Sequence, residues 1–200
     1  MEAPHSQAPA DPSPATHTVR LTVDSAELMR ETGRRLAALL RPGDLVMLTG
    51  ELGAGKTTLT RGLGEGLGVR GAVTSPTFAI ARVHPPLGDG PALVHVDAYR
   101  LGGGLDEMED LDLDISLPES VTVVEWGDGK VEELAEDRLH LVFDRPLGDD
   151  TAGSAVDDGG DEPRVVTVTG LGERWTSPSA VAGLAVLGAG PGEGADGSGS

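Results

Sequence analysis

Several residue types are absent or scarce in this 200-residue chain. It contains no cysteine, which excludes disulfides and any cysteine-based metal or redox site. Aromatic residues make up only 2% of the chain, and no apolar run is long enough to cross a bilayer. The N-terminus has neither a basic start nor an apolar stretch, so it is not a signal peptide. We therefore expect a cytoplasmic protein without membrane contact.

Positive charge is also scarce. The chain has 15 Lys and Arg residues against 33 Asp and Glu residues, which gives a net charge of −18, and only two of the basic residues are lysines. Nucleic-acid binding depends on Lys and Arg side chains that neutralise backbone phosphates. Direct binding of DNA or RNA is therefore not expected. A protein partner, or a phosphate ligand held by backbone amides and Mg²⁺, is compatible with this charge.

Composition predicts one folded domain between two tails. Residues 1–17 are rich in Pro, Ala and Ser, and residues 186–200 are rich in Gly, Pro, Ala and Ser, so both segments are expected to be disordered. Residues 18–185 form the expected domain, because a chain of this length suffices for one core but hardly for two. Within it, the acidic residues 146–163 are expected to form a long loop that joins two strands.

The pattern of apolar residues predicts an α/β fold with a mixed sheet. Asp24 and Glu27 form a capping-box pattern that is expected to open a helix, which Pro42-Gly43 ends. Residues 44–50 are typical of a buried strand, and residues 56–68 of a second helix. Five further strands are expected at residues 78–84, 91–97, 121–126, 138–143 and 164–170.

A glycine-rich segment joins the first of these strands to the second helix. Its sequence, GELGAGKT at residues 50–57, matches the phosphate-loop pattern G-x-x-x-x-G-K-[ST]. Glycines let backbone amides converge on phosphate oxygens, and the following helix points its positive end at the same anion. The Lys56 ammonium can reach the β- and γ-phosphates, and the Thr57 hydroxyl can bind Mg²⁺. The segment therefore predicts a single P-loop NTPase domain, with a mixed, mostly parallel sheet flanked by few helices.

Two of the predicted strands end in a carboxylate, Asp97 and Glu125. Parallel strands beside a phosphate-loop strand end at the same edge of the sheet as the phosphates. A carboxylate there can bind Mg²⁺ or orient an attacking water. For either residue alone, an ordinary acidic strand end is an equal alternative. Trp126, which follows Glu125, is compatible with a place in the site or in the core.

The segment TSPTF, residues 74–78, lies between the second helix and the next strand. Its hydroxyls could contact a γ-phosphate or its Mg²⁺, as GTPase switch segments do. Pro76 alone would also explain a polar turn that enters a strand, and the residues by themselves favour that simpler interpretation.

Taken in order, GELGAGKTT, TSPTF, HVDAYRL and VVEW resemble the bacterial TsaE (YjeE) family of P-loop ATPases, over roughly residues 18–170. The resemblance implies a weak, partner-dependent, Mg²⁺-dependent ATPase that is required for N6-threonylcarbamoyladenosine (t6A) at adenosine 37 of tRNA. It also implies that ATP hydrolysis resets the TsaD–TsaB pair, which transfers the threonylcarbamoyl group. Contact with tRNA would then be only indirect.

The resemblance assigns a role to each matching position. Lys56, Asp97 and Glu125 would be catalytic, and Thr57 and Glu125 would hold Mg²⁺, with Asp97 as a second acidic position near the metal. Trp126 would respond to nucleotide. The mobile switch-like segment would be Thr74, Ser75, Pro76 and Thr77. The contacts to ATP would be Gly50, Glu51, Leu52, Gly53, Ala54, Gly55, Lys56, Thr57 and Thr58, with Ser25 and Arg164 at further family positions near the nucleotide.

The chain also departs from the family pattern. Gly127 follows the Glu-Trp pair where proline is frequent, Ala98 stands where leucine is frequent, and the acidic loop and both tails are additions. Two alternative functions are a small-molecule kinase and a non-hydrolysing ATP-sensing module. A kinase usually brings a basic lid to its second substrate, whereas the second half of this chain is acidic. Guanine specificity is not expected, because the chain has no asparagine and no Asn/Thr-Lys-x-Asp segment.

Overall fold

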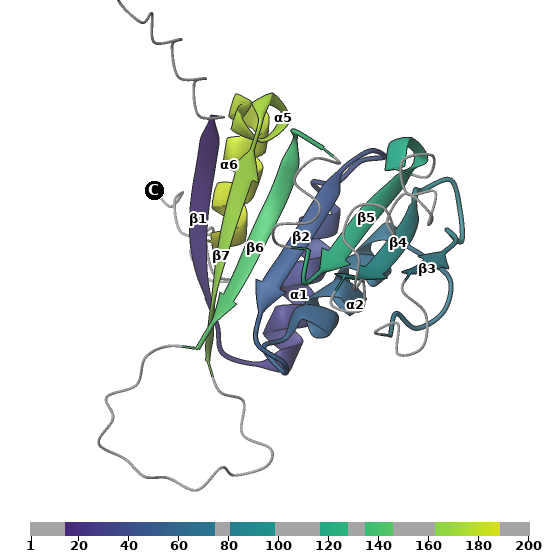
Figure 1. The fold of residues 1–200 in the computed structure, drawn as a ribbon, viewed down its shortest axis with the longest axis horizontal. Coiled ribbons are helices and arrows are strands. Elements are labelled where there is room, and N and C mark those ends of the chain that lie inside the picture. Colours follow the sequence, from purple (N-terminus) through teal and green to yellow (C-terminus); the bar gives the residue numbers. More distant parts are fainter. Residues whose placement is uncertain (1–14, 75–80, 99–116, 128–134, 146–162, 189–200) are drawn as a thin grey trace, which may run out of the picture.

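The computed structural model of the chain describes residues 15–74, 81–98, 117–127, 135–145 and 163–188 (Figure 1). Of the expected acidic loop at 146–163, only Pro163 is among them. The strands are β1 (Thr16–Val23), β2 (Leu45–Gly50), β3 (Ala81–His84), β4 (Ala92–Asp97), β5 (Ser120–Glu125), β6 (Arg138–Asp144) and β7 (Arg164–Leu171). The helices are α1 (Ala26–Ala37), α2 (Lys56–Leu67), α5 (Glu173–Thr176) and α6 (Pro178–Gly188), with a short 3₁₀ helix at Leu117–Glu119.

The seven strands form one sheet in the order β1-β7-β6-β2-β5-β4-β3. Strand β2 is parallel to both of its neighbours, β5 and β6, and β4 is parallel to β5. The outer pairs β1–β7, β6–β7 and β3–β4 are antiparallel. The sheet is thus mixed, with a parallel centre that contains the phosphate-loop strand, as the sequence predicts. This architecture is that of an α/β P-loop NTPase domain.

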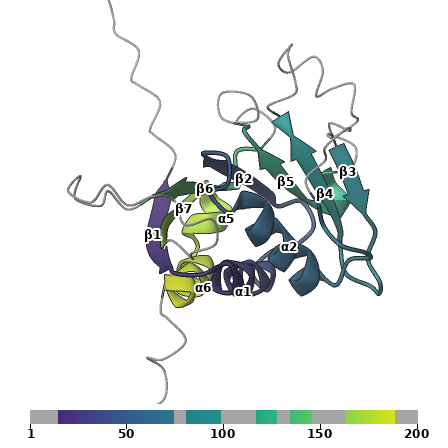
Figure 2. The ribbon, with the colours of Figure 1, turned by 90° about the horizontal axis from the view of Figure 1, so that it is seen from below.

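Helices α1, α2 and α6 lie side by side on one face of the sheet (Figure 2). The main core lies between them and the strands, because alternate residues of the sheet turn apolar side chains toward the helices. A smaller apolar cluster lies on the opposite face, over β2, β4 and β5. It consists of Leu45, Met47, Val94, Val96, Ala98 and Val124. Among the described residues, no helix has both the length and the apolar character to cross a membrane.

Helices α1 and α2 approach each other backbone to backbone. A Cβ atom at Gly62 of α2 would lie 2.0 Å from the carbonyl oxygen of Arg30, and one at Gly33 of α1 would lie 2.2 Å from the carbonyl oxygen of Leu59. Only glycine leaves room for such an approach. The two glycines therefore fix α2, and with it the phosphate loop, against α1.

The structure corrects the expected start of the first helix. Ser25 is its N-cap, with extended backbone angles (φ −152°, ψ 160°) and a hydroxyl that accepts a hydrogen bond from the Leu28 N–H at 3.1 Å. The predicted capping box on Asp24 is therefore wrong by one residue. Asp24 and Ser25 are both good caps, and the point at which β1 ends selects the second of them.

Two elements overlap the segments that were expected to be tails. Strand β1 begins at Thr16, inside the range 1–17, and α6 continues to Gly188, inside the range 186–200. The first was missed although residues 16–23 alternate exposed and more buried residues, a pattern that is typical of a strand. The second was missed because α6 is built from small residues whose composition is close to that of the glycine-rich sequence after it.

Candidate functional site

The register of the sheet brings the two predicted carboxylates to the phosphate loop. Leu48 of β2 pairs with Glu125 of β5, and Asp97 of β4 pairs with the same Glu125. Gly50, the last residue of β2, pairs with Phe143 near the end of β6. The parallel centre of the sheet therefore ends at a single edge, and the loop begins there, as expected for a phosphate site.

The phosphate loop uses glycine where other residues would be strained. Gly53 has φ +79° and Gly55 has φ +106°, both in the left-handed region. A Cβ atom at Gly55 would also lie 3.0 Å from Cε of Met29 in α1, whereas one at Gly53 would meet nothing within 4 Å. The loop is thus packed against α1 on one side and open at Gly53.

Helix α2 begins without a side-chain cap. The residue at its N-cap position is Gly55, which has no side chain to accept a hydrogen bond, and the first turn contains no acidic residue. The first N–H groups of a helix have no partner within the helix, and together with the helix dipole they favour an anion. The start of α2 therefore has the features that favour a bound anion such as phosphate.

Lys56 lies inside this loop and is only 4% exposed. Its ammonium donates hydrogen bonds to the carbonyl oxygens of Gly50 (2.7 Å) and Glu51 (2.9 Å). Burial lowers the pKa of Lys56, and the negative charges of Glu125 and Asp97 act against this lowering. Lys56 is thus a poorly solvated cation that the carbonyl groups of its own loop hold in place.

Trp126 lies next to the Lys56 ammonium, with the ring centroid 4.1 Å from Nζ. An ammonium over an indole face is an attractive cation–π arrangement. Among the residues that the structure describes, Trp126 is also the one non-glycine residue whose φ angle is positive (+62°). This conformation costs about 1–3 kcal/mol, and a hydrogen bond from the Trp126 N–H to the Leu48 carbonyl (3.1 Å) helps to hold it. The ring of Trp126 thus faces the loop.

A buried hydrogen-bond group connects β4, β5 and α2. Thr57, in the first turn of α2, donates its hydroxyl to Oε1 of Glu125 at 3.2 Å. Nε2 of His95 lies 2.9 Å from the same oxygen. Glu125 is 5% exposed and His95 is fully buried. His95 was not among the predicted site residues, although a histidine inside the apolar strand VHVD, two residues before Asp97, was a usable signal.

The oxygen atoms of Thr57 and Glu125 are suitable ligands for Mg²⁺. One is a hydroxyl oxygen and the others are carboxylate oxygens, and Mg²⁺ is usually held by one or two carboxylates together with phosphate oxygens and water. Thr57 donates its hydrogen to Glu125, which leaves lone pairs of its own oxygen for a cation. No cluster of three or more His, Asp or Glu side chains within the described ranges could hold a metal ion by itself. A metal at this edge would therefore depend on the phosphates for further ligands.

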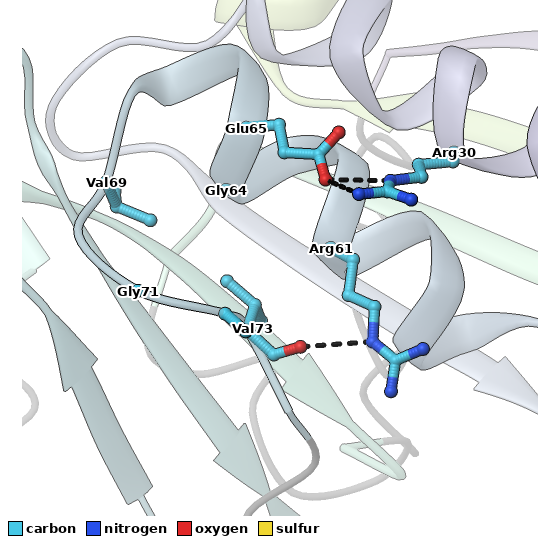
Figure 3. Close-up of a pocket in the computed structure, with 8 residues that line it drawn as sticks. Arg30, Arg61, Gly64, Glu65, Val69, Gly71 and Val73 are labelled. Carbon is cyan, nitrogen blue, oxygen red and sulfur yellow. Dashed lines mark hydrogen bonds and ion pairs between the residues drawn. The ribbon is translucent and has the colours of Figure 1, made fainter.

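The predicted switch-like segment is described only at its first residue, Thr74; Ser75, Pro76 and Thr77 lie outside the described residues. The Thr74 hydroxyl accepts a hydrogen bond from Arg82 of β3 at 2.8 Å. Just before it, the Val73 carbonyl accepts one from Nε of Arg61 in α2 at 3.1 Å (Figure 3). The entrance to this segment is thus tied to the helix that begins at the phosphate loop.

Figure 3 also shows a small pocket between this entrance and α2, about 90 Å³ in volume. Arg30 and Arg61 both line it, but Arg30 is paired with Glu65 of α2. Residues of the phosphate loop are not part of its lining. We therefore place the candidate site at the loop and not in this pocket.

The two remaining predicted residues lie at the same edge of the sheet. Arg164 opens β7 and pairs with Val23, the last residue of β1, and Ser25 follows two residues later. The Arg164 guanidinium donates to the Pro163 carbonyl at 3.2 Å, and the Ser25 hydroxyl caps α1. The fold thus brings both residues to the end of the sheet at which the phosphate loop begins.

Known proteins resemble this chain in sequence and in structure. The family model "Threonylcarbamoyl adenosine biosynthesis protein TsaE" matches residues 23–150. The tRNA threonylcarbamoyladenosine biosynthesis protein TsaE of Streptomyces coelicolor is 78% identical over 149 residues, which cover 74% of this chain and 95% of that protein. The Bacillus subtilis protein of the same name is 40% identical over 141 residues, or 70% and 77% of the two chains. The crystal structure of Bacillus subtilis YdiB has a TM-score of 0.61 at 30% identity and covers 88% of this chain and 97% of its own.

Proposed function

The chain belongs to the TsaE family, whose members take part in the biosynthesis of threonylcarbamoyladenosine in tRNA, and on that premise we propose that it binds and hydrolyses Mg-ATP at the β2–α2 loop. The observation that carries this proposal is the start of α2, where an uncapped helix, a buried ammonium and a Thr57–Glu125 hydrogen bond meet. Together they provide amide donors, a positive charge and metal ligands for a triphosphate.

Lys56 would exchange partners when phosphate binds. Its ammonium is held by two neutral carbonyl oxygens, at Gly50 and Glu51. A phosphate oxygen carries negative charge and is a stronger acceptor. Burial lowers the pKa of Lys56, and the added negative charge would act against this lowering. The Trp126 ring lies against Nζ, so this exchange would change its surroundings.

Thr57, Glu125 and Asp97 would serve the metal and the attacking water. Bound Mg²⁺ would neutralise charge that develops on the phosphates. Thr57 and Glu125 would hold it, because their oxygens already lie within hydrogen-bond distance of each other. Asp97, which pairs with Glu125 in the register of the sheet, would accept a hydrogen bond from the attacking water. Substituting Glu125→Gln or Asp97→Asn should reduce hydrolysis more than nucleotide binding, which single-turnover assays and calorimetry can separate.

The hydrolysis cycle would act on a protein partner and not on tRNA directly. A net charge of −18 opposes contact with an RNA backbone. We propose a TsaD–TsaB-type complex as this partner, with t6A at adenosine 37 of tRNA as its product. Turnover by the isolated chain should be slow, and the partner should accelerate it.

The decisive experiment measures ADP release by the isolated chain, with TsaD–TsaB, and with candidate small-molecule acceptors. Stimulation by TsaD–TsaB alone is the expected result. Stimulation by an acceptor alone would favour a kinase, and ATP binding without ADP release in any mixture would favour an ATP sensor. Nucleoside analysis of tRNA from cells depleted of the protein tests the pathway separately, because t6A should fall in those cells.

A further inference from the structure

His95 lies in the middle of β4, under helix α2, and has no exposed surface. Its strand neighbour Leu93 lies on the same face, and a Cβ atom at Gly64 of α2 would be 3.5 Å from Leu93 Cδ2. The imidazole therefore lies between the sheet and the helix that begins at the phosphate loop. A polar ring in such a place requires a hydrogen-bond partner, and that partner is Glu125.

We propose that His95 is a positioning residue for Glu125, whose carboxylate it holds against Thr57 through an Nε2–H···Oε1 hydrogen bond. This inference rests on the proposed function, because it takes Glu125 to be a ligand of the Mg-ATP site. Residues behind the direct ligands of a metal commonly orient those ligands in this way.

The hydrogen-bond partners of the imidazole determine its tautomer. Nδ1 of His95 is buried and has no hydrogen-bond partner among the described residues. A hydrogen on Nδ1 would form a buried N–H group without an acceptor among the described residues, which is costly. The tautomer with its hydrogen on Nε2 avoids this cost and donates to Glu125. His95 thus acts as a fixed donor to Glu125.

Two donors on one carboxylate oxygen restrict how the Glu125 side chain can turn. Oε1 accepts from His95 at 2.9 Å and from Thr57 at 3.2 Å. Without the shorter bond, only the longer contact to Thr57 would orient the carboxylate. Loss of the His95 hydrogen bond should therefore weaken metal binding, because loss of such a supporting residue typically lowers metal affinity by about 10–100-fold.

Two amide substitutions separate positioning from packing. His95→Gln places an amide N–H near the position of Nε2, whereas the shorter side chain of His95→Asn reaches only about as far as Nδ1. Calorimetry should compare ATP affinity with Mg²⁺ and with EDTA for both variants and the wild type. Mg²⁺ should increase the ATP affinity of the wild type, and we expect this increase to be at least about tenfold smaller in His95→Asn. His95→Gln should retain most of the increase. In EDTA the three proteins should bind ATP alike.

A second measurement needs no variant. Imidazole ¹⁵N chemical shifts of the nucleotide-free wild type, assigned by comparison with His95→Gln, should show a hydrogen on Nε2 and none on Nδ1 of His95. A hydrogen on Nδ1 would overturn the inference, as would equal losses in Mg²⁺ and EDTA, or equal impairment of both variants. Failure of the proposed function looks different: the wild type itself would then bind no ATP, while the ¹⁵N shifts would still report whether His95 donates to Glu125.

Discussion

Helices α1 and α2 are both 12 residues long and pack directly against each other, but they begin in opposite ways. Helix α1 starts with the side-chain cap of Ser25 and has Glu27 in its first turn, so its own sequence satisfies one of its free N–H groups and complements its dipole. Helix α2 starts at Gly55 with neither a cap nor an acidic residue. One helix start is capped by a side chain of the chain itself, and the other is not; the proposed function assigns the second to the phosphates of ATP.

The capped helix also supports the uncapped one. Met29 of α1 packs against Gly55 at the start of α2. Further along, Arg30 and Arg34 of α1 donate hydrogen bonds to Glu65 of α2, at 2.7 Å and 2.8 Å. The hydrogen bonds of Lys56 to the Gly50 and Glu51 carbonyl oxygens stabilise the loop from within, and packing against α1 supports it from outside. Helix α1 provides that support, and the following substitutions separate the roles of the two helices.

The largest effect should come from Lys56→Ala, which removes the charge at the uncapped helix start. A hydrogen bond to a charged group contributes up to about 3 kcal/mol, so ATP affinity should fall on the order of 100-fold or beyond detection. Calorimetry provides the measurement. The control is Lys130→Ala, which removes the only other lysine and should leave the affinity unchanged. Unaltered binding by Lys56→Ala would show that the ammonium does not contact phosphate.

Gly62→Ala should separate the two helices. The new Cβ atom would lie 2.0 Å from the backbone oxygen of Arg30, so one helix must move. Overpacking of this kind typically costs about 1–3 kcal/mol, and a clash with backbone places this variant at the upper end. Urea unfolding measures the loss. Gly88→Ala is the matched control, because a Cβ atom there would meet nothing within 4 Å. Equal stability of the two variants would contradict the close approach of the helices.

Much of the difference between the starts of α1 and α2 can be predicted from the sequence, because it depends on local patterns of residues. The phosphate loop, the start of α2 at Lys56 and its end before Gly68 all follow from glycines and apolar spacing. The order of the strands and the partner of His95 do not follow in this way. The bond from His95 to Glu125 exists only because β4 pairs with β5 in one particular register. The paired residues of β4 and β5 are 28 apart in the sequence, and such distant pairing leaves no local signal.

Local signals also fail where two residues are equally suitable. Asp24 and Ser25 both cap helices well, and only the backbone angles decide between them. Strand β1 is a different case, because THTVRLTV alternates exposed residues with more buried ones and Leu21 and Val23 face the core. This alternation is a local strand signal that the prediction did not use.

Ser25→Ala tests the capped helix start, with a smaller expected effect. Loss of an N-cap side chain leaves a free N–H group and typically costs about 1 kcal/mol of stability. Thermal or urea unfolding should show this loss. Asp24→Ala is the control, since the structure places the cap at Ser25; a greater loss for Asp24→Ala would restore the capping box that the sequence predicted. A simultaneous fall in ATP affinity for Ser25→Ala would show that the hydroxyl also serves the nucleotide.

The smallest effect concerns the ion pairs that join the two helices. The pKa of Glu65 is lowered below its ordinary value near 4.5, first by the hydrogen bond from Arg30 and also by Arg34, with burial acting against them. Between the lowered pKa and 4.5 the unfolded chain therefore binds more protons than the folded one. The stabilisation is present above that range and is lost as the pH falls through the lowered pKa.

Glu65→Gln should accordingly flatten the acid dependence of stability. Glu65 is more than a third exposed, so its pairs contribute at most about 1 kcal/mol at neutral pH. Melting temperatures between pH 3 and pH 7 should fall less steeply for the variant than for the wild type, and salt should reduce the difference. Glu173→Gln, at an exposed glutamate for which the described part of the chain shows no ion pair, should behave like the wild type. Parallel curves for wild type and Glu65→Gln would mean that glycine packing alone, without these charges, holds α1 against the phosphate-loop helix.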